Sequence, residues 1–209
     1  MNTTFYNSKL TENSKFSNEN YLDYDFSFCD FNKSYFVNSN FENCIFQKGK
    51  SLQLAFFNCR FKNCKFINFD FRSIPVGADG GVFSSCHFLS CNFKGRQFEY
   101  PHFDLCLFDK CILKNINFND ASFYKTKFIG KLEDVTFNGL YHKKSSGFKI
   151  IDYVDFSDAI LGEFVTFENC DLSTSVPPMG TQFSEFLYQI KEDSPHILST
   201  GSRDKVVIK

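Results

Sequence analysis

An all-β solenoid is the fold class that the sequence predicts, because aromatic residues recur at an interval of five. Phe occupies positions 56, 61, 66 and 71, and Cys stands two residues before two of them. On an α-helix this interval would spread the rings around the axis, and on a flat strand it would send alternate rings to opposite faces. A chain that turns a corner every five residues instead directs every central ring into one interior.

The same register extends in both directions along the chain. From residue 16 to residue 71 every slot except Ser51 is aromatic, and from residue 83 to residue 128 all slots are apolar. A further slot falls near the C-terminal end of the repeats. The predicted core comprises Phe26, Phe31, Phe36, Phe41, Phe46, Phe56, Phe61, Phe66, Phe71, Phe83, Phe88, Phe93, Phe98, Phe103, Phe108, Leu113, Phe118, Phe123, Phe128 and Phe156.

The residues around these slots resemble the repeat of the pentapeptide-repeat family. In that repeat a small residue, and often Asp or Asn after it, precedes a central Leu or Phe. The stretches 39–41, 91–93 and 170–172 match this pattern, and the resemblance covers about residues 14–172. It implies a right-handed quadrilateral β-helix with four pentads in each coil. The preference for Phe over Leu at the central slot departs mildly from the common pattern.

The chain is expected to have three parts. Residues 1–14 predict a polar N-terminal cap, and residues 15–172 predict the β-helix. Two interruptions break the β-helix, at 72–82 and at 129–152. The first contains Pro and Gly and predicts a loop that projects from the wall, and the second contains a basic stretch that predicts another loop.

Residues 173–209 predict a cap helix followed by a polar tail. Two consecutive Pro residues, at 177 and 178, end the repeats. Apolar residues then recur at helical spacing between Phe183 and Ile190. A short helix here is expected to cover the open end of the β-helix, which would otherwise expose strand edges and rings.

All nine cysteines lie two residues before a central apolar slot. The resemblance places a small inward side chain there, so we predict buried and reduced thiols. The odd count and the lack of an apolar signal segment near Met1 agree with this. A zinc site formed by Cys86, Cys91, Cys106 and Cys111 is the alternative, but a CxxC knuckle is absent and the pentad already explains the spacing. No metal or cofactor is expected.

Composition and spacing argue against several classes of protein. The net charge of −1 predicts no strong field for nucleic acid. No apolar run approaches the roughly 18 residues of a membrane span. No titratable cluster converges, so an enzyme is not expected. The predicted location is the cytoplasm, and secretion into a host cell by an uncleaved signal is the alternative.

The walls, the loops and the terminal helix remain for a protein partner. Residues 150–190 contain no Lys or Arg, which predicts an acidic surface on the last coil. Both interruptions are candidate contacts, because loops on rigid scaffolds often carry function. The candidate partner-binding residues are Pro75, Asp79, His142, Lys143, Lys144, Asp152, Asp155, Asp158 and Glu163.

Three functional hypotheses stay open. The first is a protein-binding scaffold that acts as a secreted bacterial effector, or as the β-helix domain of one, because such effectors carry similar Phe- and Asn-rich coils. The second is a DNA-mimicking protein that binds DNA gyrase, as the quinolone-resistance branch of the family does. The repeat blocks 15–72 and 83–128 together hold fourteen Lys and Arg against ten Asp and Glu, which disfavours this. The third is a purely structural repeat protein. A dimer through the C-terminal segment is an alternative to a monomer.

Overall fold

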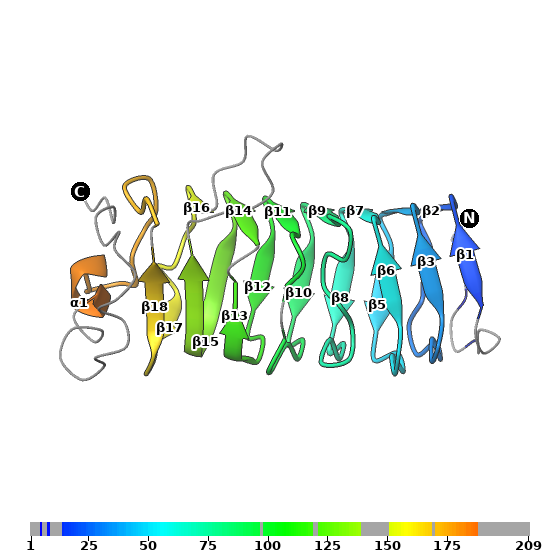
Figure 1. Cartoon of the computed structure of the whole chain (residues 1–209), viewed down its shortest axis with the longest axis horizontal. Helices are drawn as coiled ribbons and strands as arrows, with labels where there is room; N and C mark the ends of the chain where they lie inside the picture. The colour runs from blue at the N-terminus through cyan, green and yellow to red at the C-terminus, as the bar shows by residue number, and fades with distance from the viewer. Residues whose placement is uncertain are drawn as a thin grey trace, which may run out of the picture.

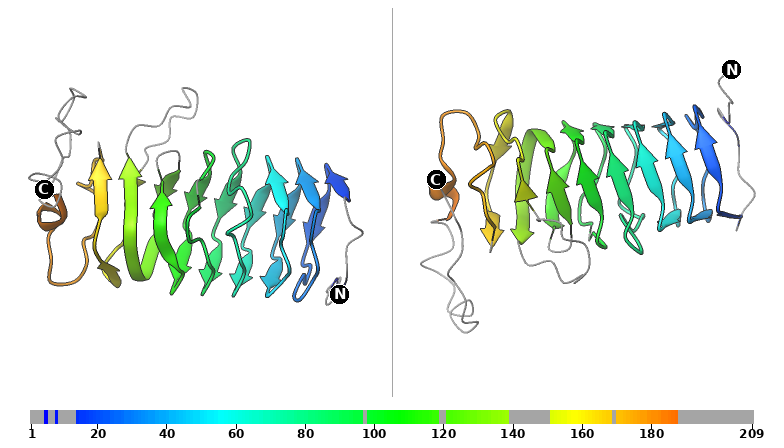
Figure 2. Two further views of the ribbon diagram at one scale, coloured as in Figure 1. Left: turned by 60° about the horizontal axis from the view of Figure 1, so that its bottom comes forward. Right: turned by 90° about the horizontal axis from the view of Figure 1, so that it is seen from above.

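The protein is a column of stacked coils. The computed structural model describes residues 5, 8, 14–96, 98–118, 121–138, 151–168 and 170–187. They form a parallel β-solenoid of about six turns, whose short strands cross the long axis of the column (Figure 1). β1 lies at one end and α1 at the other, and the coils follow each other in sequence order (Figure 2). The predicted fold class is confirmed.

Four walls enclose the interior. Wall 1 begins with β1 (Lys15–Ser17), β3 (Tyr35–Val37) and β6 (Ala55–Phe57). Wall 2 stacks β2 (Asn20–Leu22), β4 (Asn40–Glu42), β7 (Arg60–Lys62), β9 (Val82–Ser84), β11 (His102–Asp104), β14 (Ser122–Tyr124) and β16 (Ile151–Asp152).

Wall 3 stacks β5 (Ile45–Gln47), β8 (Lys65–Ile67), β10 (His87–Leu89), β12 (Leu107–Asp109) and the first residues of β15 (Lys127–Asn138). Wall 4 is joined by single bridges, such as Asp70 with Asn92, and continues through β13 (Leu113–Asn117), the middle of β15 and β17 (Ala159–Leu161). β18 (Val165–Glu168) pairs with the end of β15 and returns the chain to wall 1.

Most strands of walls 1 to 3 are three residues long and direct the central side chain inside. On wall 2, Phe41 pairs with Tyr21 in the coil before and with Phe61 in the coil after. The interval is twenty residues, or four pentads. Rings stacked along this ladder lie 4.8 Å apart, centroid to centroid, for Tyr21 with Phe41 and for Phe41 with Phe61. Parallel stacking along a wall and edge contacts between walls together fill the interior.

All twenty predicted core side chains are buried, each with at most 5% of its surface exposed. The exception to the Phe register, Ser51, is compensated by a ring from a neighbouring slot. Phe69 occupies a position that holds Cys in other coils, and it is fully buried. Its ring fits because Gly49 has no side chain: a Cβ there would lie 3.0 Å from the Phe69 ring and 2.9 Å from Phe31. The core therefore stays filled where the repeat lapses.

The first interruption, 72–82, is not a projecting loop. The coil simply becomes two residues longer, so that Phe61 pairs with Phe83. Three apolar side chains at alternate positions, Ile74, Val76 and Ala78, face inward and are buried. The Pro and Gly residues suggested a loop, but the apolar alternation keeps the segment within wall 1, where Val76 pairs with Phe98.

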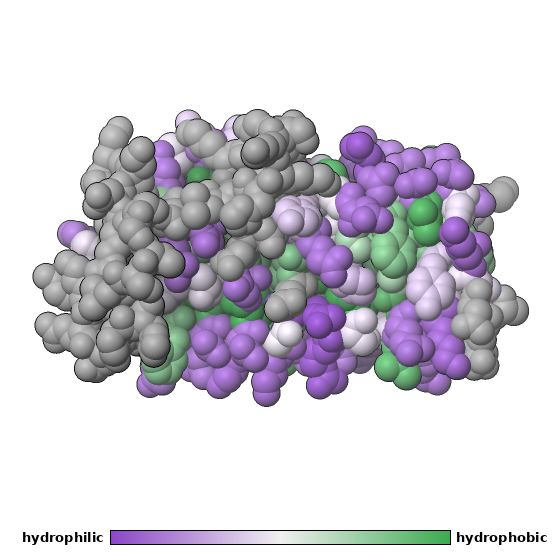
Figure 3. Space-filling view, viewed as in Figure 1, coloured by the Kyte–Doolittle hydropathy of each residue, from purple (hydrophilic) through white to green (hydrophobic). Residues whose placement is uncertain are grey.

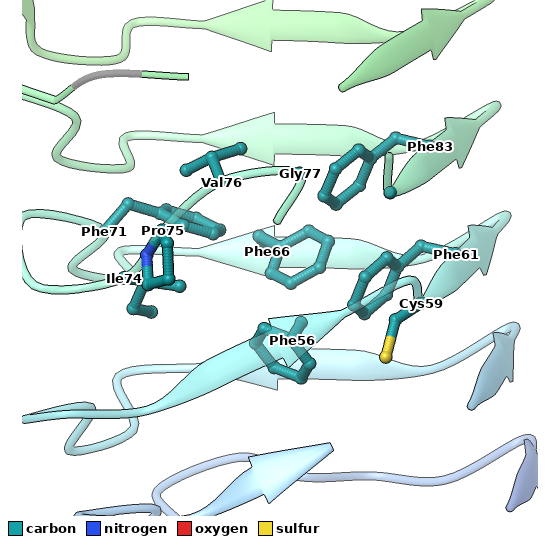
Figure 4. A pocket seen from close by; sticks show the side chains of 11 residues that line it. Phe56, Cys59, Phe61, Phe66, Phe71, Ile74, Pro75, Val76, Gly77 and Phe83 are labelled. Carbon is teal, nitrogen blue, oxygen red and sulfur yellow. The ribbon is translucent and has the colours of Figure 1, made fainter. Parts of the chain in front are cut away.

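A cavity of about 10 Å³ lies beneath this longer segment. It is lined by rings from several walls, and Ile74, Pro75 and Val76 close one side of it (Figure 4). This volume is close to the minimum that holds one water molecule, and the lining is apolar. It is a packing defect of the longer coil rather than a ligand site.

The second interruption, predicted over 129–152, is also partly wrong. Residues 129–138 belong to β15, which continues from wall 3 through wall 4 to wall 1. Leu132, Val135 and Phe137 face inward and are buried. Their spacing of three and two residues departs from five, which concealed them in the sequence. Residues 139–150, the predicted basic loop, lie outside the described residues.

A short helix covers the C-terminal end of the core, as predicted. α1 (Phe183–Leu187) places Phe183 edge-on against Phe167, 5.5 Å between centroids, and against Phe156, at 6.0 Å. At the opposite end Phe5 stacks on Phe26 at 5.4 Å. Within the described residues, no helix has the length and apolar composition needed to cross a membrane.

Candidate functional site: the corner between walls 2 and 3

The predicted acidic residues do not form one surface. Asp152 lies on wall 2, whereas Asp155 and Asp158 lie on either side of Lys127 on wall 3, with oxygen to Nζ distances of 3.1 and 2.6 Å. Glu163 lies beyond wall 4. Five residues turn the chain through one corner, so Asp152, the pair Asp155 and Asp158, and Glu163 lie at different places around the column. The predicted acidic surface is therefore wrong as a single patch.

The other predicted contacts are also separate. Pro75 is half-buried in wall 1, and Asp79 is exposed at the corner that follows. His142, Lys143 and Lys144 lie outside the described residues. The structure thus brings none of the described candidates together with another except Asp155 and Asp158.

Cysteine has one structural role in the column. The thiols of Cys64 and Cys106 donate hydrogen bonds to backbone oxygens of the coil before, at 3.4 and 3.3 Å. Thr126 does the same one coil after Cys106, at 3.2 Å. Burial raises the pKa of the Cys59 thiol to about 11. Among the described residues, no group of three or more His, Cys, Asp or Glu is placed to hold a metal ion.

We expect the nine thiols to stay reduced and to resist alkylation in the folded protein. All nine are buried, and a thiol without access to solvent reacts slowly because the reagent cannot reach it and the thiolate is the nucleophile. Treatment with iodoacetamide and intact-mass analysis should show fewer than about two labelled thiols without denaturant. Full labelling in guanidinium chloride is the control, and rapid labelling of the native protein would contradict the inward placement.

His102 and Ser122 form the closest approach to a catalytic pair. The His102 Nδ1 lies 2.7 Å from the Ser122 hydroxyl oxygen on the neighbouring strand. Ser122 is fully buried, however, so its hydroxyl is closed to a substrate. The pair packs wall 2 rather than forming an accessible nucleophile.

This histidine should make stability depend on pH. Burial lowers the pKa of His102, and the nearby Asp104 opposes this less strongly. The unfolded chain then binds the proton more readily, so this contribution is present above about pH 6.5 and is lost as the pH falls below it. Urea unfolding of wild type and His102→Asn between about pH 5 and about pH 7.5 tests this. The variant should show the shallower decline, and equal slopes would exclude His102 as the source.

Exposed aromatic and aliphatic side chains gather at the corner between walls 2 and 3. Leu105 and Tyr153 are each 53% exposed, and Lys125 lies between them in the same corner column. The Lys125 Nζ lies 5.0 Å from the centroid of the Tyr124 ring and 6.0 Å from that of Tyr153. The two tyrosine rings meet edge to face at 6.1 Å. We call Leu105, Tyr124, Lys125 and Tyr153 the corner ridge.

The backbone conformation at these corners does not require the bulky side chains of the corner ridge. Residues in this corner column adopt a positive φ, and earlier coils use small polar residues there, such as Asn43 and Asn63. Leu105 and Tyr153 have φ of 54°. Bulky residues in this conformation are strained by about 1 kcal/mol or more. Both strain and exposure therefore oppose Leu and Tyr at these positions.

A second apolar area lies on wall 1. Figure 3 shows hydrophobic side chains over β3 and β6 on a face that is otherwise largely polar. Here Tyr35 and Phe57 stack on each other, 6.5 Å between centroids, and both are half-buried. These residues lie on ordinary strands, where aromatic side chains are favoured without a binding role. The corner ridge is the more informative site.

The corners also decide the type of fold. In the first complete coil, Asn18, Asp23, Phe28 and Lys33 have φ of 59° to 60° at intervals of five residues. Four such corners close one coil of twenty residues. The fold is that of a pentapeptide-repeat β-helix. The amide ladders follow from the same geometry, because identical corners stack: Asn58 donates to Asn38 at 3.0 Å.

Several solved pentapeptide-repeat structures are similar to this β-helix. The plasmid-mediated fluoroquinolone resistance protein QnrB1 is 16% identical, with 82% of this chain and 78% of that chain covered and a TM-score of 0.36. HetL, which is involved in heterocyst differentiation regulation in the cyanobacterium Nostoc, is 12% identical, with coverage of 85% and 92% and a TM-score of 0.46. No protein-family model matches the sequence, and no curated protein matches it. The fold assignment rests on the chain's own register rather than on these likenesses.

Proposed function

We propose that this β-helix is a non-catalytic scaffold that binds a protein partner through the corner ridge. The carrying observation is that Leu105 and Tyr153 are exposed in a strained conformation that Asn would adopt more easily. Tyr is enriched among the residues that contribute most to protein interfaces, and Leu105 supplies apolar area. Half-buried Leu107, at the start of the wall 3 strand that follows Leu105, extends the apolar surface beside the ridge.

A role as a secreted bacterial effector, or as a domain of one, is the setting that we propose for this scaffold. It is supported by the Phe- and Asn-rich coils and by the near-neutral net charge of −1. Mimicry of DNA for gyrase is the alternative, and it requires a long anionic face. The described acids are spread over different walls, and Lys127 pairs with two of them. A gyrase supercoiling assay with quinolone should therefore show no protection by the protein.

The ridge can be tested by variants that separate stability from binding. Leu105→Asn should raise the free energy of unfolding by up to about 1 kcal/mol, because Asn tolerates positive φ. The same change, combined with Tyr153→Asn, should weaken capture of the partner by about tenfold. Capture is measured with immobilised full chain in bacterial and host lysates, followed by mass spectrometry.

The matched control is Leu22→Asn, an exposed Leu on wall 2 near the opposite end of the column. It should leave the captured proteins unchanged. A partner that binds the ridge variant and the wild type equally, while Leu105→Asn is stabilised as expected, would show that the ridge is not the binding site. Clear protection of gyrase would favour the mimicry alternative instead.

A further inference from the structure

We propose that wall 4 is a second docking surface, which binds an extended acidic segment of a protein that also carries apolar residues. The evidence is separate from the corner ridge. Wall 4 carries seven exposed cations but only three carboxylates over five coil segments, 48–53, 68–73, 90–96, 110–115 and 130–134. The cations are Lys48, Lys50, Arg72, Lys94, Lys110, Lys114 and Lys131, and we call them the basic strip.

The basic strip is a ladder of like charges. Asp70 pairs with Asn92, and Asn92 pairs with Ile112, so Arg72, Lys94 and Lys114 stack in consecutive coils. Like charges directly opposite each other on adjacent strands are destabilising. The whole chain has a net charge of −1, so this excess is local to one wall. An anionic partner would compensate it.

Ion pairs within the protein neutralise only part of the strip. Lys50 pairs with Asp30 of the preceding coil at 3.5 Å. Arg72 donates to both oxygens of Asp70, and the shortest contact is 2.7 Å. Lys114 and Lys131 both pair with Glu133. The hydrogen bond from Lys114 is the larger cause, and that from Lys131 the smaller, of a Glu133 pKa lowered to about 2. Among the residues that the structure describes, Lys48, Lys94 and Lys110 form no ion pair. These three are the charges that remain for a ligand.

A hollow interrupts the wall where the Phe register lapses. Its volume is about 490 Å³, and its lining includes Lys50, Arg72, Asn32 and the exposed side chain of Leu52. Gly49 and Ser51 also line it. The other walls are ladders of regular strands, so this concave stretch gives the basic strip a place where a side chain of the partner can enter.

The mixture of groups favours a protein segment over nucleic acid. Leu52 is 60% exposed and Ile112 is 50% exposed, and both lie among the cations. Asp70 and Glu133 also stay on the wall, where they would repel a phosphate backbone. Carboxylates interspersed with apolar side chains match this surface better. Four steps of about 4.8 Å make the strip about 19 Å long, which accommodates an extended segment of about six residues.

The test uses the full chain and a fluorescein-labelled twelve-residue peptide made of Asp, Glu and Leu. Binding measured by fluorescence anisotropy should be saturable and should weaken as salt is added. Lys94→Glu combined with Lys110→Glu should weaken it by about tenfold or more, because two attractive charges become repulsive. Leu52→Asn should weaken binding of this peptide but not of a peptide that contains only Asp and Glu.

The matched control is Lys15→Glu combined with Lys62→Glu, which changes the net charge equally on walls 1 and 2. It should alter the affinity by less than about twofold. Equal losses in the two double variants, or tighter binding of a single-stranded oligonucleotide than of the peptide, would overturn the proposal. Circular dichroism checks the fold, and Lys94→Gln with Lys110→Gln replaces the charge reversal if that variant unfolds. Leu105→Asn should leave peptide binding unchanged, so failure of the corner ridge and of the basic strip can be told apart.

Discussion

Replacing Phe61 with Ala is expected to lower the free energy of unfolding by about 3 to 5 kcal/mol. The ring is 2% exposed and lies between Phe41 and Phe83, with both centroid distances at 4.8 Å. Backbone hydrogen bonds hold the coils on either side at a fixed spacing, so the walls cannot close on the cavity. The small void that already borders Phe61 beneath residues 72–82 would merge with the new one.

Urea unfolding followed by circular dichroism measures this loss. Lys62→Ala is the control, because the neighbouring side chain points outward and its ion pair with Glu42 is exposed. It should change stability by less than about 0.5 kcal/mol. A solenoid is stabilised by contacts between adjacent coils, so the Phe61 variant should also broaden the transition if the two halves separate. Similar losses in both variants would show that the inward register is wrong.

The five-residue register was sufficient to predict the core, because the central residue of every repeat has the same kind of surroundings. A ring at this position always meets rings from the coils on both sides, as Phe88 meets Phe66 and Phe108. The compensating pair Gly49 and Phe69 was not predictable, because it depends on two positions twenty residues apart. The spacing alone marks Phe69 as a position for a small residue.

The candidate binding surfaces were less predictable because they depend on which wall each residue occupies. Acids close together in sequence suggested a patch, but the corners place Asp152 on wall 2 and Glu163 beyond wall 4, and only Asp155 and Asp158 stay together, at Lys127. The basic strip combines residues from five coils, and no continuous stretch of sequence contains it. One signal for the ridge was available: Leu105 stands two residues after Phe103, where the four preceding coils carry Asp, Asn, Asn and Ser. Tyr153 gave no such signal, because its slot, Ile151, follows a coil of irregular length.

The longer coil at residues 72–82 also depends on one glycine. Gly77 has φ of +83°, and a Cβ at this position would lie 2.5 Å from the Cβ and 2.7 Å from the Cα of Pro101 in the next coil. The left-handed conformation disfavours any other residue, and the contact with backbone atoms cannot be relieved by a rotamer change. The two extra residues can therefore stay within the wall only if position 77 lacks a side chain.

We accordingly expect Gly77→Ala to lower the free energy of unfolding by about 3 kcal/mol or more, from left-handed strain and overpacking combined. Gly95→Ala separates the two causes, because Gly95 also has a positive φ, +71°, but the nearest atom to its Cβ would be the Asn115 amide nitrogen at 3.9 Å. This control should lose only about 1 kcal/mol. Both values come from urea unfolding under the same conditions. Equal losses would mean that the close approach to Pro101 contributes nothing, and that the longer coil tolerates a side chain by moving away from its neighbour.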